Sequence, residues 1–147
     1  MTNDAIHILL VDDDSAHRKL ACRALSEAFP KLRIHEAASN DQARELLRLT
    51  SFRAVILDLR LGADSGLVLL ELLRKSHDRL TLPVLILSTS ALEQDIQASY
   101  RLGANCYIVK SSDPEEYQTS LKKAVKFFLP FCTPIQKKRH DIPPATT

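Results

Sequence analysis

The chain has 147 residues, of which 45% are hydrophobic and 26% are charged, and its formal net charge is +2. This length suits one domain that buries a core without disulfides, and the composition excludes a disordered chain or a membrane span. The small net charge argues against a folded surface that wraps nucleic acid, and the N-terminus lacks the pattern of a secretory signal. We therefore expect a cytoplasmic protein with neither membrane nor nucleic-acid contacts.

Apolar runs and helical periodicities alternate through the first half of the chain. Three strands are predicted, at residues 6–11, 32–36 and 54–57. Three segments with apolar residues at helical spacing follow them, at residues 16–28, 41–49 and 67–73. Ser15 and Asn40 are the expected N-caps of the first two helices, and Pro30 ends the first helical pattern.

The second half of the chain continues the alternation. Two further apolar runs predict strands at residues 84–87 and 106–109. A helix is predicted at residues 92–102, where Gly103 provides the expected C-terminal stop. Asp113 and Pro114 form a strong helix start, because an aspartate N-cap precedes a proline at the first helical position, and this helix should run to about residue 129.

Five strands that alternate with five helices predict an α/β fold, a doubly wound five-stranded parallel sheet with helices on both faces. One domain should therefore span residues 5–129. Residues 130–147 contain four of the seven prolines and a basic stretch without a periodic apolar face. They predict a flexible C-terminal tail with no output domain.

Reactive side chains stand at the carboxyl ends of four of the predicted strands, where ligands bind in open α/β sheets. They are Asp12 and Asp13, Asp58, Ser88 and Lys110. Three carboxylates repel one another unless a cation lies among them, and oxygen ligands favour Mg²⁺. A carboxylate can also attack phosphorus, while Lys110 and Ser88 would supply hydrogen-bond donors to the phosphoryl oxygens. The pattern predicts magnesium-dependent phosphoryl transfer.

Two sequence segments resemble the response-regulator receiver family over roughly residues 5–129, including its chemotaxis members. They are LLVDD at residues 9–13 and VILD at residues 55–58, with Gly66 eight positions after Asp58. The resemblance implies a flavodoxin-like fold with strand order 2-1-3-4-5, and Asp58 as the phosphoacceptor. It also implies a Mg²⁺ ion bound by Asp13 directly, by Asp12 often through water, by Asp58 and by the backbone carbonyl of Arg60.

The same resemblance assigns further residues to the site. Lys110 matches the lysine that pairs with the phosphate, Ser88 the conformational-switch hydroxyl, and Tyr107, three residues before Lys110, the aromatic switch coupled to it. Thr89 matches the adjacent small position of the phosphate environment. Arg60 and Ser90 occupy variable positions that influence how fast water removes the phosphate in this family.

Two residues depart from the family pattern. The family often has proline after the lysine and proline four residues after the acceptor, whereas this chain has Ser111 and Gly62. A cis peptide bond at Lys110-Ser111 would cost about 3 kcal/mol, against less than about 1 kcal/mol before proline. We therefore expect an altered loop after the fifth strand.

The resemblance implies a stand-alone response regulator rather than an enzyme, which catalyses only its own phosphorylation and dephosphorylation. Its partners would be a sensor histidine kinase or a histidine phosphotransfer protein, and a downstream effector protein. The signal would be a conformational change of the face formed by the fourth helix, fifth strand and fifth helix. A weaker resemblance to phytochrome-associated single-domain response regulators implies a homodimer through that face.

Two alternatives belong to other functional classes. A phosphate-independent pseudo-receiver would serve only as an interaction module, against which the complete set of acidic pair, acceptor, hydroxyl and lysine argues. A phosphatase of the haloacid-dehalogenase type would use Asp12 as its nucleophile. That family's motif resembles Asp-x-Asp-x-Thr/Val, in which Asp12 and Asp14 fit but Ala16 does not.

Overall fold

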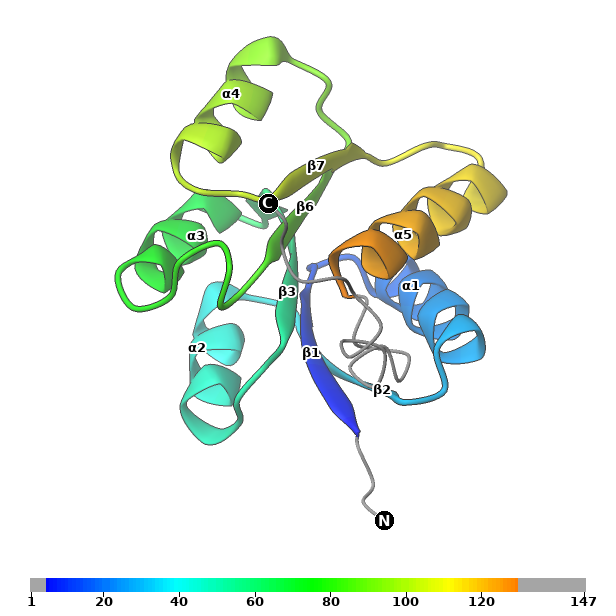
Figure 1. The fold of residues 1–147 in the computed structure, drawn as a ribbon. Helices are drawn as coiled ribbons and strands as arrows, with labels where there is room; N and C mark the ends of the chain where they lie inside the picture. Colours follow the sequence, from blue (N-terminus) through cyan, green and yellow to red (C-terminus); the bar gives the residue numbers. More distant parts are fainter. Residues whose placement is uncertain (1–4, 130–147) are drawn as a thin grey trace, which may run out of the picture.

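The computed structural model describes residues 5–129, which form one parallel sheet covered by helices (Figure 1). The five strands of the sheet are β1 (Ile6–Val11), β2 (Leu32–Ala37), β3 (Ala54–Asp58), β6 (Val84–Ser88) and β7 (Cys106–Val109). The helices are α1 (Ser15–Ala28), α2 (Asn40–Leu49), α3 (Gly66–Arg74), α4 (Glu93–Arg101) and α5 (Pro114–Phe128). The predicted C-terminal tail, residues 130–147, lies outside the described residues.

The strand order β2-β1-β3-β6-β7 corresponds to the predicted order 2-1-3-4-5, and every neighbouring pair is parallel. The predicted fold class is therefore confirmed. Strand β3 lies in the centre of the sheet. Its Leu57 pairs with Val11 of β1, and its Asp58 pairs with Leu87 of β6. All five residues of β3 and all five of β6 are buried, as expected for strands covered on both faces.

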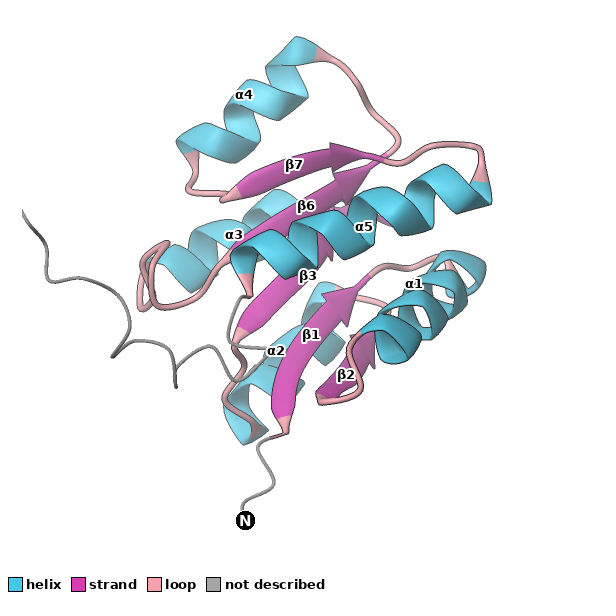
Figure 2. Ribbon diagram, turned by 45° about the vertical axis from the view of Figure 1, so that its right-hand side comes forward, coloured by secondary structure: helices cyan, strands magenta, loops and turns pink. Residues whose placement is uncertain are grey.

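Two hydrophobic clusters cover the two faces of the sheet. Ile8, Ile56 and Leu121 belong to the cluster beneath α1 and α5. Leu9 and Leu57 belong to the cluster beneath α2 and α3. Figure 2 shows α1 and α5 on one side of the sheet, with α2 and α3 behind it. The alternation along each strand thus sends successive side chains to opposite cores.

The two N-caps predicted from the sequence are wrong by one residue each. Asp14 caps α1, because its Oδ1 accepts hydrogen bonds from the backbone amides of Ala16 and His17 at 2.9 and 3.1 Å. Ser39 caps α2 through the backbone amide of Gln42. Asn40 is instead buried and donates a hydrogen bond to the backbone carbonyl of Ser65. Each correct cap directly precedes another residue type that also caps helices well.

A short hairpin joins β3 to α3, which the sequence did not predict. Its strands are β4 (Arg60–Leu61) and β5 (Asp64–Ser65), which pair antiparallel. Two-residue strands are too short to show hydrophobic periodicity. The hairpin places the turn at Gly62 beside the carboxyl end of β1, as described below. No helix within residues 5–129 is both long enough and apolar enough to cross a membrane.

Candidate functional site: an acidic pocket at the carboxyl ends of the strands

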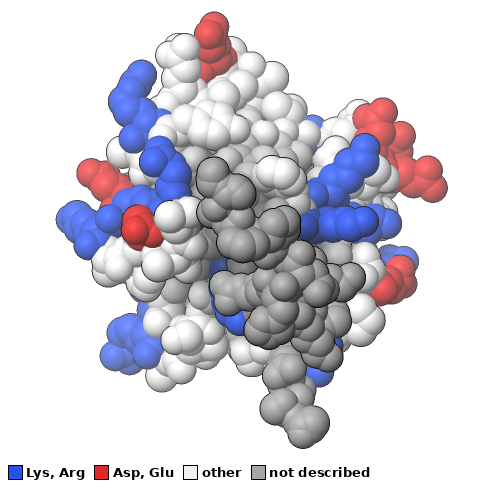
Figure 3. Space-filling model, in the orientation of Figure 1, with Lys and Arg blue, Asp and Glu red and all other residues white. Residues whose placement is uncertain are grey.

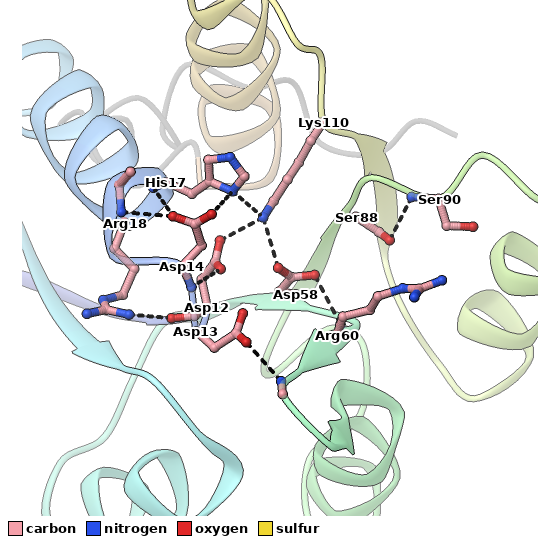
Figure 4. A network of polar contacts seen from close by, with 12 residues as sticks. Asp12, Asp13, Asp14, His17, Arg18, Asp58, Arg60, Ser88, Ser90 and Lys110 are labelled. Carbon is pink, nitrogen blue, oxygen red and sulfur yellow. Dashed lines mark hydrogen bonds and ion pairs between the residues drawn. The ribbon is translucent and has the colours of Figure 1, made fainter.

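Three aspartates from two strand ends meet in one pocket (Figure 4). One carboxylate oxygen from each of Asp12, Asp13 and Asp58 lies within 4.8 Å of the others. Asp12 and Asp58 are buried, with 1% and 7% of their surfaces exposed, whereas Asp13 is exposed. The parallel pairing of β1 with β3 causes this proximity, because it brings the ends of both strands to the same edge of the sheet.

Lys110 extends from the end of β7 into this acidic pocket. Its Nζ donates hydrogen bonds to Asp12 Oδ2 and to Asp58 Oδ2, both at 2.8 Å. The Lys110 side chain is only 4% exposed, so both ion pairs are shielded from water. Its backbone amide also donates to the carbonyl of Ser88, which ties the end of β7 to β6. The structure therefore brings together the four charged residues that stand at the carboxyl ends of the predicted strands, Asp12, Asp13, Asp58 and Lys110.

Backbone amides complete the hydrogen bonding of the carboxylates. The amide of Asp14 donates to Asp12 Oδ1 at 2.9 Å, and the amide of Arg60 donates to Asp58 Oδ1 at 3.1 Å. The amide of Gly62 in the hairpin turn donates to Asp13 Oδ2 at 2.9 Å. Each of the three carboxylates thus has a backbone donor that limits its rotation.

Burial and charge oppose each other at the centre of the pocket. Desolvation raises the pKa of the Asp58 carboxyl above its usual value, although the hydrogen bond and charge of Lys110 act in the other direction. For Lys110, desolvation lowers the pKa, but the hydrogen bonds and charges of Asp12 and Asp58 outweigh it, so the pKa is raised. Lys110 is accordingly an ammonium group at neutral pH.

The carboxyl end of β6 carries the predicted hydroxyl cluster. Ser88 is fully buried, and its Oγ accepts a hydrogen bond from the amide of Ser90 at 3.1 Å. It therefore organises its own loop and does not cap α4, whose N-cap is Leu92. Ser90 Oγ donates to Asp95 in α4 at 2.5 Å, whereas Thr89 is exposed.

Tyr107 is connected to this loop. Its hydroxyl donates a hydrogen bond to the backbone carbonyl of Ser90 at 2.8 Å, across a separation of 17 residues in sequence. Its backbone amide donates to the hydroxyl of Tyr100 in α4. The side chain is partly buried against the α2 and α3 side of the core. Tyr107 thus contacts both the loop after Ser88 and helix α4.

A family model for the response regulator receiver domain matches residues 8–122. This chain belongs to that family. The structure of the phosphorylated cyanobacterial phytochrome response regulator RcpA has a TM-score of 0.77 and 29% identity, covering 88% of this chain and 97% of that one. The Mn²⁺-bound response regulator Rcp1 has a TM-score of 0.75 and 26% identity, covering 84% and 94%.

Curated relatives agree with the family assignment. The probable methanogenesis regulatory protein FilR2 of Methanothrix harundinacea is 30% identical over 132 residues, which are 86% of this chain and 85% of the relative. The regulatory protein VirG of Agrobacterium tumefaciens is 31% identical over 122 residues, which are 82% of this chain but only 43% of VirG. The matched residues therefore span less than half of the length of VirG.

The structure shows how the chain accommodates both departures from the receiver pattern. Gly62 has a φ of +65°, and its amide donates to Asp13. A proline at this position could not adopt the positive φ and has no N–H to donate. Ser111 follows a trans peptide bond, since no bond within residues 5–129 is cis. Its hydroxyl instead accepts from the amide of Asp113 and donates to Glu116.

Arg60 lies beside the pocket without directing its charge into it. Figure 4 shows its side chain extending away from the three aspartates, while its backbone amide contacts Asp58. Arg60 is exposed and pairs with Ser65 in the hairpin. Its main chain is therefore the part of the residue that contributes to this receiver site.

Sequence reasoning missed two residues of α1 that complete the receiver pocket. His17 Nδ1 lies 2.9 Å from Lys110 Nζ. Arg18 donates a hydrogen bond to the backbone carbonyl of Asp12 at 2.6 Å and pairs with Glu36 at 3.0 Å. Both residues stand in the first turn after the acidic run, and that position was the available signal. Sequence spacing alone could not show that His17 contacts Lys110 or that Arg18 contacts the carbonyl of Asp12.

A separate cavity of about 690 Å³ lies between α2 and α3. Its lining includes Phe52 and Leu82, which precede β3 and β6, so it lies at the opposite end of the sheet from the aspartates. Arg48 and Lys75 on its wall stand at the ends of α2 and α3, where positive charge complements the helix dipole. Figure 3 shows acidic side chains interspersed with basic ones on the side where Figure 1 places these helices.

Proposed function

We propose that Asp58 accepts a phosphoryl group from a sensor histidine kinase or a histidine phosphotransfer protein, in a Mg²⁺-dependent reaction. One observation carries the proposal: the Lys110 ammonium lies 2.8 Å from carboxylate oxygens of both Asp12 and Asp58, and a third carboxylate lies within 4.8 Å. A carboxylate nucleophile beside an ammonium group and a cluster of carboxylates that can hold a cation is the arrangement that phosphoryl transfer to an aspartate uses.

The residues present fit a divalent metal ion. Three carboxylates face a single ammonium group, so the pocket keeps excess negative charge that Mg²⁺ would balance. Asp12, Asp13, Asp58 and the backbone carbonyl of Arg60 would hold the ion. Bound Mg²⁺ would neutralise charge on the phosphoryl oxygens as the new bond forms.

The protein groups around Asp58 suit an in-line transfer. A carboxylate oxygen of Asp58 would attack phosphorus, the bond to the donor imidazole nitrogen would break, and its electron pair would stay on that nitrogen. Lys110 would pair with the phosphoryl oxygens, because its ammonium already contacts Asp58 Oδ2. The Arg60 amide would keep the carboxylate oriented through Asp58 Oδ1. Ser88 would supply a further donor once its hydroxyl turns toward the phosphate.

Phosphorylation would replace the carboxylate of Asp58 by an acyl phosphate with a charge of about −2, and the loop after β6 would transmit the effect of this change to α4. Ser88, Ser90 and Tyr107 connect this loop to β7 and α4 by hydrogen bonds. Helix α4 has one buried residue, Ser99, and no side-chain N-cap bond, so few contacts hold it in place. The output is a shift in the populations of two arrangements of α4, β7 and α5.

The output face would bind either an effector protein or a second copy of the chain. Leu92, Tyr100 and Val109 expose 56%, 42% and 42% of their surfaces on α4, its N-cap and β7, and Phe127 of α5 exposes 75%. Apolar side chains exposed on adjacent elements are typical of protein-binding surfaces. We infer that this face carries the output signal, with homodimerisation as one form of the output.

The decisive experiment is phosphorylation by a small acyl phosphate donor, followed by intact-mass measurement with and without Mg²⁺. The wild type should gain one phosphoryl group only when Mg²⁺ is present, and Asp58→Asn should gain none. Asp64→Asn is the matched control, because Asp64 is an exposed carboxylate in the neighbouring hairpin. An unlabelled wild type, or equal labelling of Asp58→Asn, would overturn the proposal.

A further inference from the structure

The Lys110 ammonium group has three hydrogen-bond contacts. Besides the two carboxylate oxygens at 2.8 Å, its Nζ lies 2.9 Å from Nδ1 of His17. An ammonium group has three protons and no lone pair, so Lys110 is the donor in every one of these contacts. His17 Nδ1 must therefore accept, and the neutral ring carries its proton on Nε2.

We propose that His17 is a positioning residue for Lys110, accepting its third hydrogen bond as the Nε2-protonated tautomer and thereby fixing the ammonium between Asp12 and Asp58. The inference rests on the proposed function, since it concerns how fast Asp58 is phosphorylated. It adds a residue of α1, 93 positions away in sequence from Lys110, to the site.

The surroundings of His17 fix its ring in this orientation. The ring packs against Tyr117 of α5, with 5.9 Å between the ring centroids, and Tyr117 is 3% exposed. Asp14 is the other charged group that faces His17, but its Oδ2 lies 3.6 Å from Nδ1, beyond a good hydrogen bond. The His17 side chain is 35% exposed, so a proton on Nε2 can be hydrated.

The third acceptor matters because the Lys110 side chain is flexible and almost fully buried. Four rotatable carbons would allow the ammonium to move if one of its protons lost its partner. A buried, unpaired N–H of a charged group is unfavourable, so the side chain would adopt other rotamers or admit water. Either change reduces the time that the ammonium spends where the phosphoryl oxygens must bind.

Two substitutions separate the acceptor from the bulk of the ring. His17→Asn places an amide oxygen near the position of Nδ1 and keeps an acceptor, whereas His17→Leu keeps a similar volume without one. With saturating Mg²⁺ and a small acyl phosphate donor, His17→Leu should be phosphorylated about 10-fold more slowly, equivalent to about 1.4 kcal/mol. His17→Asn should recover most of that loss, to within about 3-fold of the wild type.

The tautomer gives a readout that does not depend on phosphorylation or on any His17 variant. Imidazole ¹⁵N NMR of the wild type near pH 7.5 should show His17 with Nδ1 unprotonated and Nε2 protonated. Lys110→Met should weaken this preference, because it removes the donor to Nδ1. A proton on Nδ1 in the wild type would overturn the inference.

The two proposals fail in distinguishable ways. A wild-type protein that is not phosphorylated contradicts the proposed function, whatever tautomer His17 adopts. A wild-type protein that is phosphorylated at Asp58, while His17→Leu reacts at the same rate, contradicts only the role of His17. Equal slowing in His17→Leu and His17→Asn would also overturn it, because the slower reaction would then result from removal of the imidazole ring and not from removal of the hydrogen-bond acceptor.

Discussion

Gly66 lies directly against the backbone carbonyl of Asp58. A Cβ atom at position 66 would stand 2.1 Å from that oxygen and 3.1 Å from the carbonyl carbon, distances that no side chain can adopt without backbone movement. The amide of Gly66 also donates to the carbonyl of Leu59 at 2.8 Å, which closes the hairpin between β3 and α3. The glycine eight residues after Asp58 is therefore required by packing at the site.

Gly66→Ala should destabilise the protein by about 2–3 kcal/mol, because backbone of β3 or α3 must shift to admit the methyl group. Chemical denaturation of the variant and wild type gives this difference. Asp64→Ala, in the same hairpin but exposed, should change stability by less than about 0.5 kcal/mol. Equal unfolding midpoints for the two variants would show that the close contact is not maintained in solution.

Asp58→Asn should raise the Tm of the metal-free protein at neutral pH by on the order of 2–5 °C. Burial raises the pKa of the Asp58 carboxyl in the folded state. The folded state therefore binds the proton more tightly than the unfolded state, and stability decreases as the pH rises from the unfolded pKa through the folded one. The uncharged amide removes this penalty.

The same comparison with Mg²⁺ present should narrow or reverse the difference, because the metal stabilises the wild-type carboxylates and not the amide. Thermal unfolding with and without Mg²⁺ measures both effects. Asp64→Asn should behave like the wild type in each condition. A metal-free Asp58→Asn variant that melts below the wild type would contradict the assignment of desolvation as the dominant effect at Asp58.

The pair formed by His7 and His35 should make the protein less stable in mild acid. His7 Nδ1 lies 2.9 Å from His35 Nε2. Desolvation is the larger cause, and the charge of His7 the smaller one, that lowers the pKa of His35. The unfolded state then binds the proton more readily. Stability is thus retained above the unfolded pKa of about 6.5 and lost as the pH falls through the folded value.

Replacement of His35 by Gln should reduce the decrease in the free energy of unfolding as the pH falls. Free energies of unfolding from denaturant titrations between about pH 7.5 and 5.5 provide the test. His77→Gln removes an exposed histidine and should leave the wild-type slope unchanged. A pH dependence that is identical in wild type and His35→Gln would exclude His35 as its source.

The hydroxyl of Tyr107 should hold the loop after β6 in place. Tyr107→Phe removes the 2.8 Å bond to the carbonyl of Ser90 and should cost about 0.5–1.5 kcal/mol. Hydrogen exchange should become faster at residues 89–92, while the β4–β5 hairpin serves as an internal reference. Unchanged exchange in that loop would mean that Tyr107 does not restrain it in the unphosphorylated protein.

The sheet was predictable because its central strands are continuous apolar runs. Strands β3 and β6 are buried over their whole length, so their sequences contain little besides aliphatic residues until they reach Asp58 and Ser88. The convergence of Asp12, Asp13, Asp58 and Lys110 followed from parallel pairing together with the strand order that the family resemblance implied. Once the strand order was established, their proximity at one edge of the sheet was a geometric consequence.

The remaining features depend on contacts that no local pattern encodes. Asp14 and Ser15 are both good N-caps, as are Ser39 and Asn40, and the packing of each helix decides between neighbours. The contact of His17 with Lys110 joins residues 93 positions apart and depends on how α1 and α5 pack. Strands of two residues are too short to show hydrophobic periodicity, so β4 and β5 could not be predicted either.

The site of phosphorylation tests the central claim most directly. The protein is phosphorylated with a small acyl phosphate donor and Mg²⁺, the acyl phosphate is reduced with borohydride, and peptide mass spectrometry locates the aspartate converted to homoserine. The account predicts conversion of Asp58, with Asp12 and Asp13 unmodified. Conversion of Asp12 in place of Asp58 would contradict it.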